Sequence, residues 1–319
     1  MLSEEQLIAD YFKPLDNIHG ITPASLAIGD DAALLDIPVG KQLVISTDNL
    51  VAGVHFPENI TAFDLGKRSL AINLSDLAAM GAQAAWFTLN LTMPDSNTQW
   101  LADFSKGLAA LAKEFKCQLI GGNTSRGPLN IAISVYGLVP HGQAIRRDNA
   151  QIGDAIYVTG KLGNAAAGLQ CLQQGIDTYP GLIQQFVNPV PRINCGLALS
   201  KVASSMLDIS DGLDTDLTRL INASNVGAQL YLDKLPLDDA LIDYCGLEQA
   251  LQAALTGGDD YELCFTVPVH NIEILASKAA QIDVGYTCIG KITSGDTIDY
   301  MHNNIKIDMH LNKSFQHFN

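Results

Sequence analysis

The stretch AINLSDLAAMG, residues 71–81, shows best how this chain is built. It belongs to a longer apolar run, 62–80, whose spacing predicts a helix that ends at Gly81, a residue type that commonly follows the last helical turn. Asp76 lies inside this run, where helical packing would largely surround it. Because a buried aspartate is rare unless it is paired or binds a cation, Asp76 is a candidate metal ligand.

Strand and helix patterns alternate on both sides of this helix. The predicted elements are strands at 25–37 and 42–46, the latter ending at Thr47-Asp48, a strand at 84–92, a helix at 100–115, a turn-rich loop at 121–128 and a strand at 130–139.

A polar stretch, 140–153, separates this half from the next and predicts two domains, residues 1–145 and 146–319, of α+β class. The second half predicts a strand at 155–159, a helix capped by Asn164 and reaching about 174, a loop-rich segment at 180–191, helices at 193–203 and 213–223, and strands at 205–209, 229–232, 262–267, 287–291 and near the C-terminal end.

Composition excludes several classes of protein. The chain has 319 residues, 47% hydrophobic and 17% charged, which is typical of a globular protein. A net charge of −15 argues against a nucleic-acid partner, and no apolar run approaches the ~18 residues that span a membrane. The first residues, MLSEE, are unlike a signal peptide, and together with the lack of a membrane-spanning run they predict a cytoplasmic protein. The six cysteines are far apart and form no Cys-x-x-Cys pair, so we expect buried thiols.

Aspartates recur in short motifs, beside glycine in GDD (29–31), DISDG (208–212) and GGDD (257–260) and after Ser-Thr in STD (46–48). Two carboxylates ~4 Å apart repel by ~4 kcal/mol at an effective dielectric near 20, so a fold that gathers them needs cations. Oxygen ligands without His or Cys favour Mg²⁺. Taken singly, each motif also fits a turn or a strand end.

The DISDG segment can also be explained without a metal ion, as the start of a helix. Ser210 or Asp211 would serve as the N-cap of the following helix, with Asp214 and Asp216 facing the helix dipole and solvent. This alternative leaves Asp208, at the end of a buried strand, unexplained.

Familiar nucleotide motifs are absent. GKL at 160–162 has Leu162 where a P-loop needs Ser or Thr, and no G-x-G-x-x-G opens a helix after a strand. The segment GGNTSRG, 121–127, offers clustered N–H groups that can wrap phosphate, although Gly-Asn loops are also ordinary turns. Arg146 and Arg147 fit either a phosphate contact or a solvated linker.

Together these segments resemble the thiamine-monophosphate kinases, in the superfamily that includes aminoimidazole ribonucleotide synthetase. The resemblance is ordered, spans nearly the whole chain, and consists of IGDDA (28–32), ISTD (45–48), VAGVH (51–55), AINLSDLAAMG (71–81), IGGNTSRG (120–127), GDAIYVTG (153–160), DISDG (208–212) and GGDDYEL (257–263).

The resemblance implies transfer of the ATP γ-phosphate directly to thiamine monophosphate, giving thiamine diphosphate, with several Mg²⁺ ions. It also implies a homodimer whose N-terminal sheets form a barrel and whose C-terminal α/β domains close over nucleotide and substrate. The implied metal ligands are Asp30, Ser46, Thr47, Asp48, Asp76, Asn123, Asp208 and Asp211. The implied ATP contacts are Gly122, Asn123, Arg147 and Ser210, and the implied substrate contacts are His55, Asp259 and Phe315.

Two positions depart from the family pattern. Asn123 stands where the family has aspartate, which leaves one carbonyl oxygen but removes a charge, so we expect one weaker Mg²⁺ site. Asp259 stands where relatives have Glu, a shorter side chain of equal charge.

Rival functions are another enzyme of the superfamily or a non-catalytic sensor of nucleotide or thiamine phosphate. Selenophosphate synthetase needs a reactive Cys or selenocysteine near its N-terminus, whereas the first cysteine here is Cys117.

Overall fold

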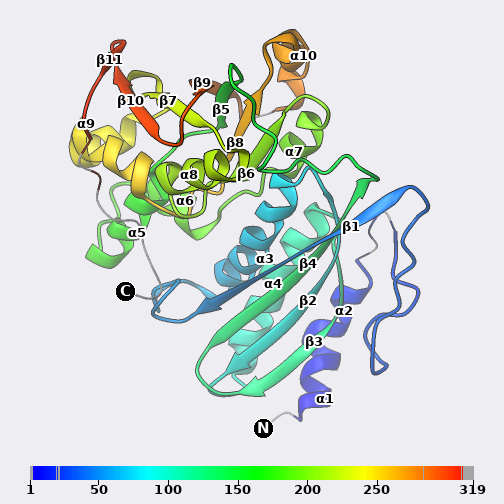
Figure 1. Ribbon diagram of the computed structural model, residues 1–319. Helices are drawn as coiled ribbons and strands as arrows, with labels where there is room; N and C mark the ends of the chain where they lie inside the picture. Colours follow the sequence, from blue (N-terminus) through cyan, green and yellow to red (C-terminus); the bar gives the residue numbers. More distant parts are fainter. Residues whose placement is uncertain (1–2, 19, 21, 283, 310, 312–319) are drawn as a thin grey trace. The chain divides into compact units, whose positions relative to one another are not determined.

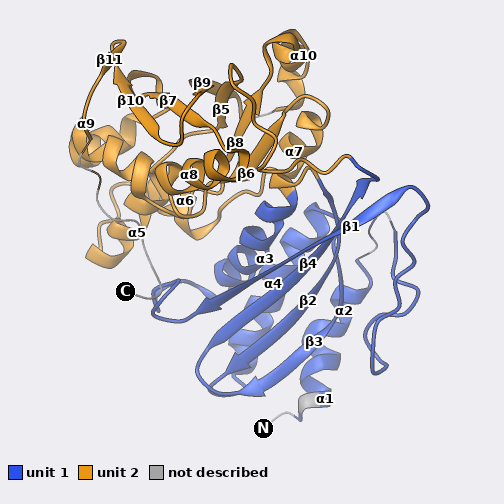
Figure 2. Cartoon of the chain, viewed as in Figure 1, with its two compact units in different colours: residues 1–77, 82–142 blue, residues 78–81, 143–319 orange. Residues whose placement is uncertain are grey.

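The computed structural model describes residues 3–18, 20, 22–282, 284–309 and 311. The chain forms two compact units (Figure 2): unit 1, residues 1–77 and 82–142, and unit 2, residues 78–81 and 143–319. Each unit has its own β-sheet and helices, as the α+β class requires. The assignment of metal binding and dimerisation to one domain, and of closure to the other, stays a prediction.

The sheet of unit 1 has the order β1-β4-β2-β3 (Figure 1). Its strands are β1 (Lys41–Val51), β2 (Gln83–Met93), β3 (Gln118–Arg126) and β4 (Asn130–Pro140). β4 is antiparallel to both β1 and β2, and β2 is parallel to β3. Within the described residues β1 and β3 are outer strands, so the sheet is open.

One face of this sheet is covered by α3 (Ala62–Ala79) and α4 (Thr98–Glu114) (Figure 1). These helices pack closely, since a Cβ at Gly66 would lie 2.2 Å from the carbonyl oxygen of Phe104 and one at Gly107 would lie 1.9 Å from that of Phe63. Gly81 follows α3 with φ +64°, as predicted.

An N-terminal segment of α1 (Glu4–Leu7), η1 (Ile8–Phe12) and α2 (Lys13–Asp16) lies near β3. It is anchored by buried Phe12 and Leu15. The Gln118 amide nitrogen donates to the Asp16 carbonyl oxygen at 2.9 Å, and its oxygen accepts from the Ala24 N–H at 2.9 Å.

Three predictions in unit 1 are wrong. Residues 25–37 form isolated bridges, Leu26 with Leu34 and Ile28 with Asp30, because the Gly29-Asp30-Asp31 turn folds the segment back. β1 continues past Asp48 to Val51. The expected loop at 121–128 is largely strand β3, since pairing with β2 overrides its turn-like composition and a register shift at Phe87/Thr88 takes up the irregularity.

Unit 2 contains a mixed sheet of order β11-β10-β7-β9-β5-β8-β6. Its strands are β5 (Ala155–Thr159), β6 (Ser205–Asp208), β7 (Gly227–Tyr231), β8 (Leu263–Val267), β9 (Tyr286–Thr293), β10 (Ile298–His302) and β11 (Ile305–Lys306). Its helices are α5 (Asn164–Gln174), α6 (Pro180–Val187), α7 (Ile193–Leu199), α8 (Leu213–Ser224), α9 (Asp239–Thr256) and α10 (Ile272–Ser277), with short turns η2 (Leu232–Lys234), η3 (Val269–Asn271) and η4 (Ala279–Gln281).

Two helices of unit 2 differ from the sequence prediction. The segment expected to be loop-rich contains α6, which begins at Pro180, a residue type suited to the first helical turn. The sequence patterns also missed α9, whose two parts meet at Gly246 with φ +79°. Among the described helices none has the length and apolar character needed to cross a bilayer.

Candidate phosphate and metal site

The outer strand β1 and helix α3 bring a first group of predicted ligands together. The Ser46 hydroxyl donates to Asp76 Oδ2 at 2.5 Å, and the Asp48 N–H donates to Asn73 Oδ1 at 2.9 Å. Asn73 and Asp76 are three residues apart on α3 and therefore share one helix face. Asn73 is not among the residues predicted from the sequence, although its spacing from Asp76 within an apolar helix was the available signal.

Thr47 does not join this group through its side chain. Successive strand side chains point to opposite faces, and the Thr47 hydroxyl donates instead to Ser134 Oγ on β4 at 2.7 Å. Asp76 itself is half-buried rather than enclosed, so the expectation that helical packing would surround it is wrong. A half-buried carboxylate remains open to a ligand.

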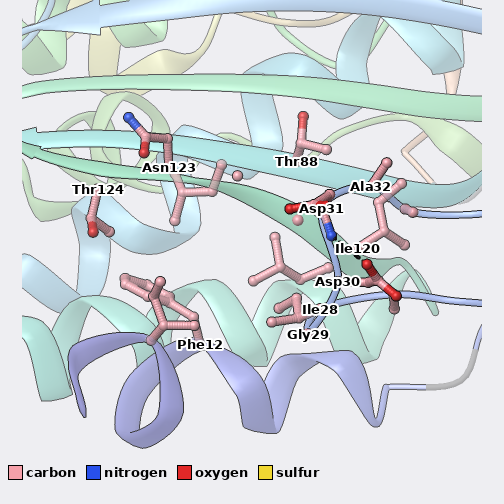
Figure 3. A pocket seen from close by; sticks show the side chains of 17 residues that line it. Phe12, Ile28, Gly29, Asp30, Asp31, Ala32, Thr88, Ile120, Asn123 and Thr124 are labelled. Carbon is pink, nitrogen blue, oxygen red and sulfur yellow. Dashed lines mark hydrogen bonds between the residues drawn. The ribbon is translucent and has the colours of Figure 1, made fainter. Parts of the chain in front are cut away.

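A second group lines a pocket of about 440 Å³ at the opposite edge of the sheet (Figure 3). Its walls come from Phe12 of the N-terminal segment, from residues 27–33, and from β2 and β3. It brings together the predicted ligand residues Asp30, Gly122 and Asn123.

Backbone contacts fix this pocket. A Cβ at Gly122 would lie 1.8 Å from the Leu89 carbonyl oxygen, and its φ is +152°, so only glycine fits where β3 meets β2. The Lys13 ammonium donates to the Ile28 carbonyl oxygen and to Asp16 Oδ2, the latter at 2.9 Å, and so ties the segment before Gly29-Asp30 to α2.

The two groups are far apart within one chain. β1 and β3 are separated by β4 and β2, and three strand spacings of about 4.8 Å amount to ~14 Å. Asp48 and Asn123 therefore do not share one ion in a single copy of unit 1.

His55 lies in the turn that follows β1. Its Nδ1 accepts from the Val51 N–H at 2.9 Å, so the neutral ring carries its proton on Nε2. The ring is half-buried and is held in one orientation by this bond.

In unit 2, the segments 208–212 and 257–262 run side by side and bring Asp208, Ser210, Asp211 and Asp259 onto adjacent backbone. The backbone hydrogen bonds are from Ile209 N–H to Glu262 O (2.8 Å), from Tyr261 N–H to Ile209 O (2.8 Å) and from Asp259 N–H to Ser210 O (2.9 Å). A Cβ at Gly258 would lie 2.5 Å from the Ser210 oxygen, so this close approach requires glycine.

Asp259 is held in an uncommon backbone conformation, with φ +71°, and Tyr261 follows with φ +51°. The Tyr261 hydroxyl donates to Asp259 Oδ1 at 3.0 Å. The side chain of Asp259 is half-buried, with its direction set by this bond.

Other acids of this region serve the fold. Glu262 is buried, accepts from Thr159 Oγ1 at 2.6 Å and from Arg192 Nε at 2.8 Å, and also contacts Arg192 Nη2. A Cβ at Gly160 would lie 2.1 Å from Glu262 Oε1, which explains the glycine before Lys161.

Asp260 binds the start of α5. It accepts from the N–H groups of Gly163 at 2.7 Å and Ala165 at 3.3 Å. Burial raises the pKa of Asp260 to about 8, and the two N–H donors oppose that rise. Gly163 occupies the N-cap position, so the predicted cap by Asn164 is wrong.

The prediction that Asp214 and Asp216 face the helix dipole and solvent is also wrong for Asp216. It is 2% exposed and not in solvent, and burial raises its pKa to about 6. Asp214 likewise bonds to the Tyr300 hydroxyl. The N-cap of α8 is Gly212, with φ +106°, and not Ser210 or Asp211.

Two further residues predicted to contact the ligands are Arg147 and Phe315. Arg147 is exposed, and its carbonyl oxygen accepts from Ser224 Oγ at 2.9 Å. Phe315 lies outside the described residues. Across the part of the chain that the structure describes, no cluster of three or more His, Cys, Asp or Glu is placed to hold a metal ion. The metal ligand set therefore stays a prediction, although its oxygen-only chemistry suits Mg²⁺.

Comparison with known proteins agrees with this fold. Residues 29–139 match the N-terminal domain of the AIR synthase related proteins, and residues 151–302 match their C-terminal domain. The chain therefore belongs to the AIR synthase related family, whose two-domain α+β fold it shares.

Individual relatives show which branch of this family the chain resembles. The thiamine-monophosphate kinase of Escherichia coli (strain K12) is 47% identical over 91% of this chain and 90% of its own length. That of Buchnera aphidicola subsp. Acyrthosiphon pisum is 43% identical over 99% of both chains. The crystal structure of the Stenotrophomonas maltophilia K279a thiamine-monophosphate kinase has a TM-score of 0.86 at 42% identity, covering 92% of this chain and 95% of that one. Within the family, the chain is one of the thiamine-monophosphate kinases.

Proposed function

We propose that this chain transfers the γ-phosphate of ATP to thiamine monophosphate, giving thiamine diphosphate and ADP. The observation that carries the proposal is the full-length similarity to thiamine-monophosphate kinases. It is supported by the structure of AaThiL complexed with AMPPCP and TMP, which has a TM-score of 0.78 at 30% identity over 99% of this chain and 97% of that one.

The residues suit direct, in-line transfer. The acceptor is a phosphate monoester, which is largely ionised near pH 7 and needs no strong base, so alignment and charge neutralisation dominate. We assign Ser46, Asp48 and Asp76 on one side, and Asp30 and Asn123 on the other, to hold Mg²⁺. When bound, Mg²⁺ would neutralise repulsion between the two phosphorylated substrates.

Three residues of unit 2, together with His55 of unit 1, would act on the ligands themselves. Ser210 offers a hydroxyl to the nucleotide phosphates, and Arg147 offers an exposed guanidinium. Asp259 and His55 would contact the substrate, each through a side chain whose direction another group already fixes.

The helix-free face of the unit 1 sheet supports a homodimer. Strand register places Thr47, Ser134 and Thr88 in one row on this face and Asn49, Asn90 and Asn123 in the next. Beside them Ile45 is 58% exposed and Leu43 is 37% exposed. We propose that two copies pair through this face and that their sheets form a barrel.

The separation of the two ligand groups fits such a dimer. Asp48 and Asn123 lie at opposite edges of one sheet, and a two-fold axis can bring opposite edges of two copies together. We propose that each site takes the Asp48 group from one protomer and the Asp30 group from its partner. A cytoplasmic location stays a prediction.

The activity test incubates purified protein with thiamine monophosphate, ATP and Mg²⁺ and measures thiamine diphosphate by chromatography. Absence of product at high Mg²⁺, despite binding of both ligands, would favour a sensor.

The shared-site test mixes two inactive variants, Asp30→Asn and Asp48→Asn, after reversible subunit exchange. Half of the dimers are then mixed, each with one intact site, so about a quarter of wild-type activity returns. No recovery after verified exchange would place both groups in one protomer's site. Ile45→Asp should yield monomers by analytical ultracentrifugation.

A further inference from the structure

We propose that Asp216 is a positioning residue that holds the loop 208–212 in its nucleotide-binding shape before any ligand arrives. The inference rests on the proposed function, in which Ser210 contacts ATP, and on the predicted role of Asp211 as a metal ligand. Asp216 itself would touch neither.

The contacts of Asp216 are directed at the loop. Its Oδ2 accepts from the backbone N–H of Ser210 at 3.0 Å and of Asp211 at 2.9 Å. Its Oδ1 accepts from Arg219 Nη1 at 2.6 Å, and Arg219 Nη2 lies 2.5 Å from Asp211 Oδ2. One buried carboxylate thus binds the loop backbone directly and, through Arg219, one of its side chains.

This arrangement occupies a natural anion site. Consecutive backbone N–H groups ahead of a helix form a concave nest that binds phosphate in many proteins. Here the nest at 210–211 precedes α8, whose N-cap Gly212 has no side chain to accept a hydrogen bond. Asp216, four residues further on, supplies the anion from within the fold.

Both peptide groups of Ser210 are consequently engaged. Its N–H bonds to Asp216, and its carbonyl oxygen accepts from the Asp259 N–H at 2.9 Å. The loop therefore presents the Ser210 hydroxyl and the Asp211 carboxylate to a ligand, and not its backbone N–H groups. This predicts side-chain recognition of phosphate and metal where a P-loop would use backbone.

The test compares Asp216→Asn with Asp214→Asn as the matched control on the same helix turn. Asp214 bonds to Tyr300 and, among the described residues, makes no hydrogen bond to the loop 208–212. In Asp216→Asn the amide cannot accept from Arg219 while also accepting both N–H groups, so Asp211 loses its orientation. We expect the Kd for AMPPCP with Mg²⁺, measured by calorimetry, to rise at least about tenfold, the loss of one charge-assisted hydrogen bond. We expect KM for ATP to rise with it.

Amide hydrogen exchange gives a readout that does not depend on activity. In the ligand-free wild type the N–H groups of Ser210 and Asp211 should be protected, and in Asp216→Asn, but not in Asp214→Asn, they should exchange faster. Free exchange in the wild type would overturn the inference. So would an unchanged Kd in a folded Asp216→Asn.

A second variant covers the case in which Asp216→Asn does not fold. Arg219 is 46% exposed, so Arg219→Gln should fold, and we expect it to raise the Kd for AMPPCP severalfold, with partial rescue by Arg219→Lys. Wild-type affinity in Arg219→Gln would overturn the inference. If the wild type binds AMPPCP and protects these amides but makes no thiamine diphosphate, the proposed function fails while the role of Asp216 stands.

Discussion

The acidic residues of unit 1 and those of unit 2 occupy different environments. In unit 1, Asp30 is exposed, and Asp48 and Asp76 are half-buried. The Asp76 carboxylate accepts from the Ser46 hydroxyl, and the Asp48 backbone N–H donates to Asn73 Oδ1. In unit 2, Asp216 and Glu262 are buried and bound to arginines, and Asp260 binds backbone N–H groups. Buried carboxylates bound to arginine stabilise the fold, whereas the partly exposed carboxylates of unit 1 can take a cation.

The largest effect on activity should follow changes in the unit 1 group. Asp76→Asn or Asp48→Asn should lower kcat by about 10²-fold or more, a loss comparable to removing one electrostatic contact to a transition state. The melting temperature should hardly change, because both residues are only half-buried. Steady-state kinetics and calorimetry check this, with Asp103→Asn, at a half-buried position of α4, as the control. Wild-type turnover would remove these acids from the site.

Changes in the buried ion pair of Arg192 and Glu262 in unit 2 should lower stability more than activity. Arg192→Met leaves Glu262 buried without its partner and should lower the free energy of unfolding by about 3–5 kcal/mol. Urea denaturation measures this. Lys106→Met, at an exposed ion pair, should change the stability by no more than about 0.5 kcal/mol. Equal effects of the two substitutions would contradict the distinction between the acids.

The pH dependence of stability sharpens the same contrast. The pKa of Asp260 is about 8 in the folded protein, above the usual value for Asp, so the folded state binds this proton more tightly than the unfolded state. Its contribution to stability is fully present below about pH 4 and is lost as pH rises through about 8. The unfolding free energy of wild type relative to Asp260→Asn should therefore fall from pH 5 to pH 8.5. A difference that rises with pH would refute the assignment.

The smallest effect concerns Asn123. Restoring the family residue with Asn123→Asp adds a charge to the pocket beside Asp30, so half-maximal activity should need severalfold less Mg²⁺. A Mg²⁺ titration at fixed ATP measures it, with Asn222→Asp, at an exposed position of α8, as the control. An unchanged requirement would place Asn123 outside the metal site.

Much of the architecture was predictable because its periodicity is strong. The helix at 62–80, Gly81 and the strand at 155–159 follow from local pattern. Strand β3 could not be predicted in this way, because its pairing with β2 stabilises as a strand a sequence that resembles a turn. The metal and substrate residues remain predictions. The structural roles of Asp216, Asp260 and Glu262 could not be predicted from the sequence, because the hydrogen-bond partners of a carboxylate can come from segments distant in sequence.

The backbone of Asp259 has a consequence for variation at this position. A left-handed φ of +71° costs an aspartate about 1 kcal/mol relative to glycine. A library selected for heat resistance alone should accumulate Gly at position 259, while selection for growth without external thiamine should keep an acid there. Opposite outcomes from the two selections would reveal a trade-off between robustness and catalysis at a single residue.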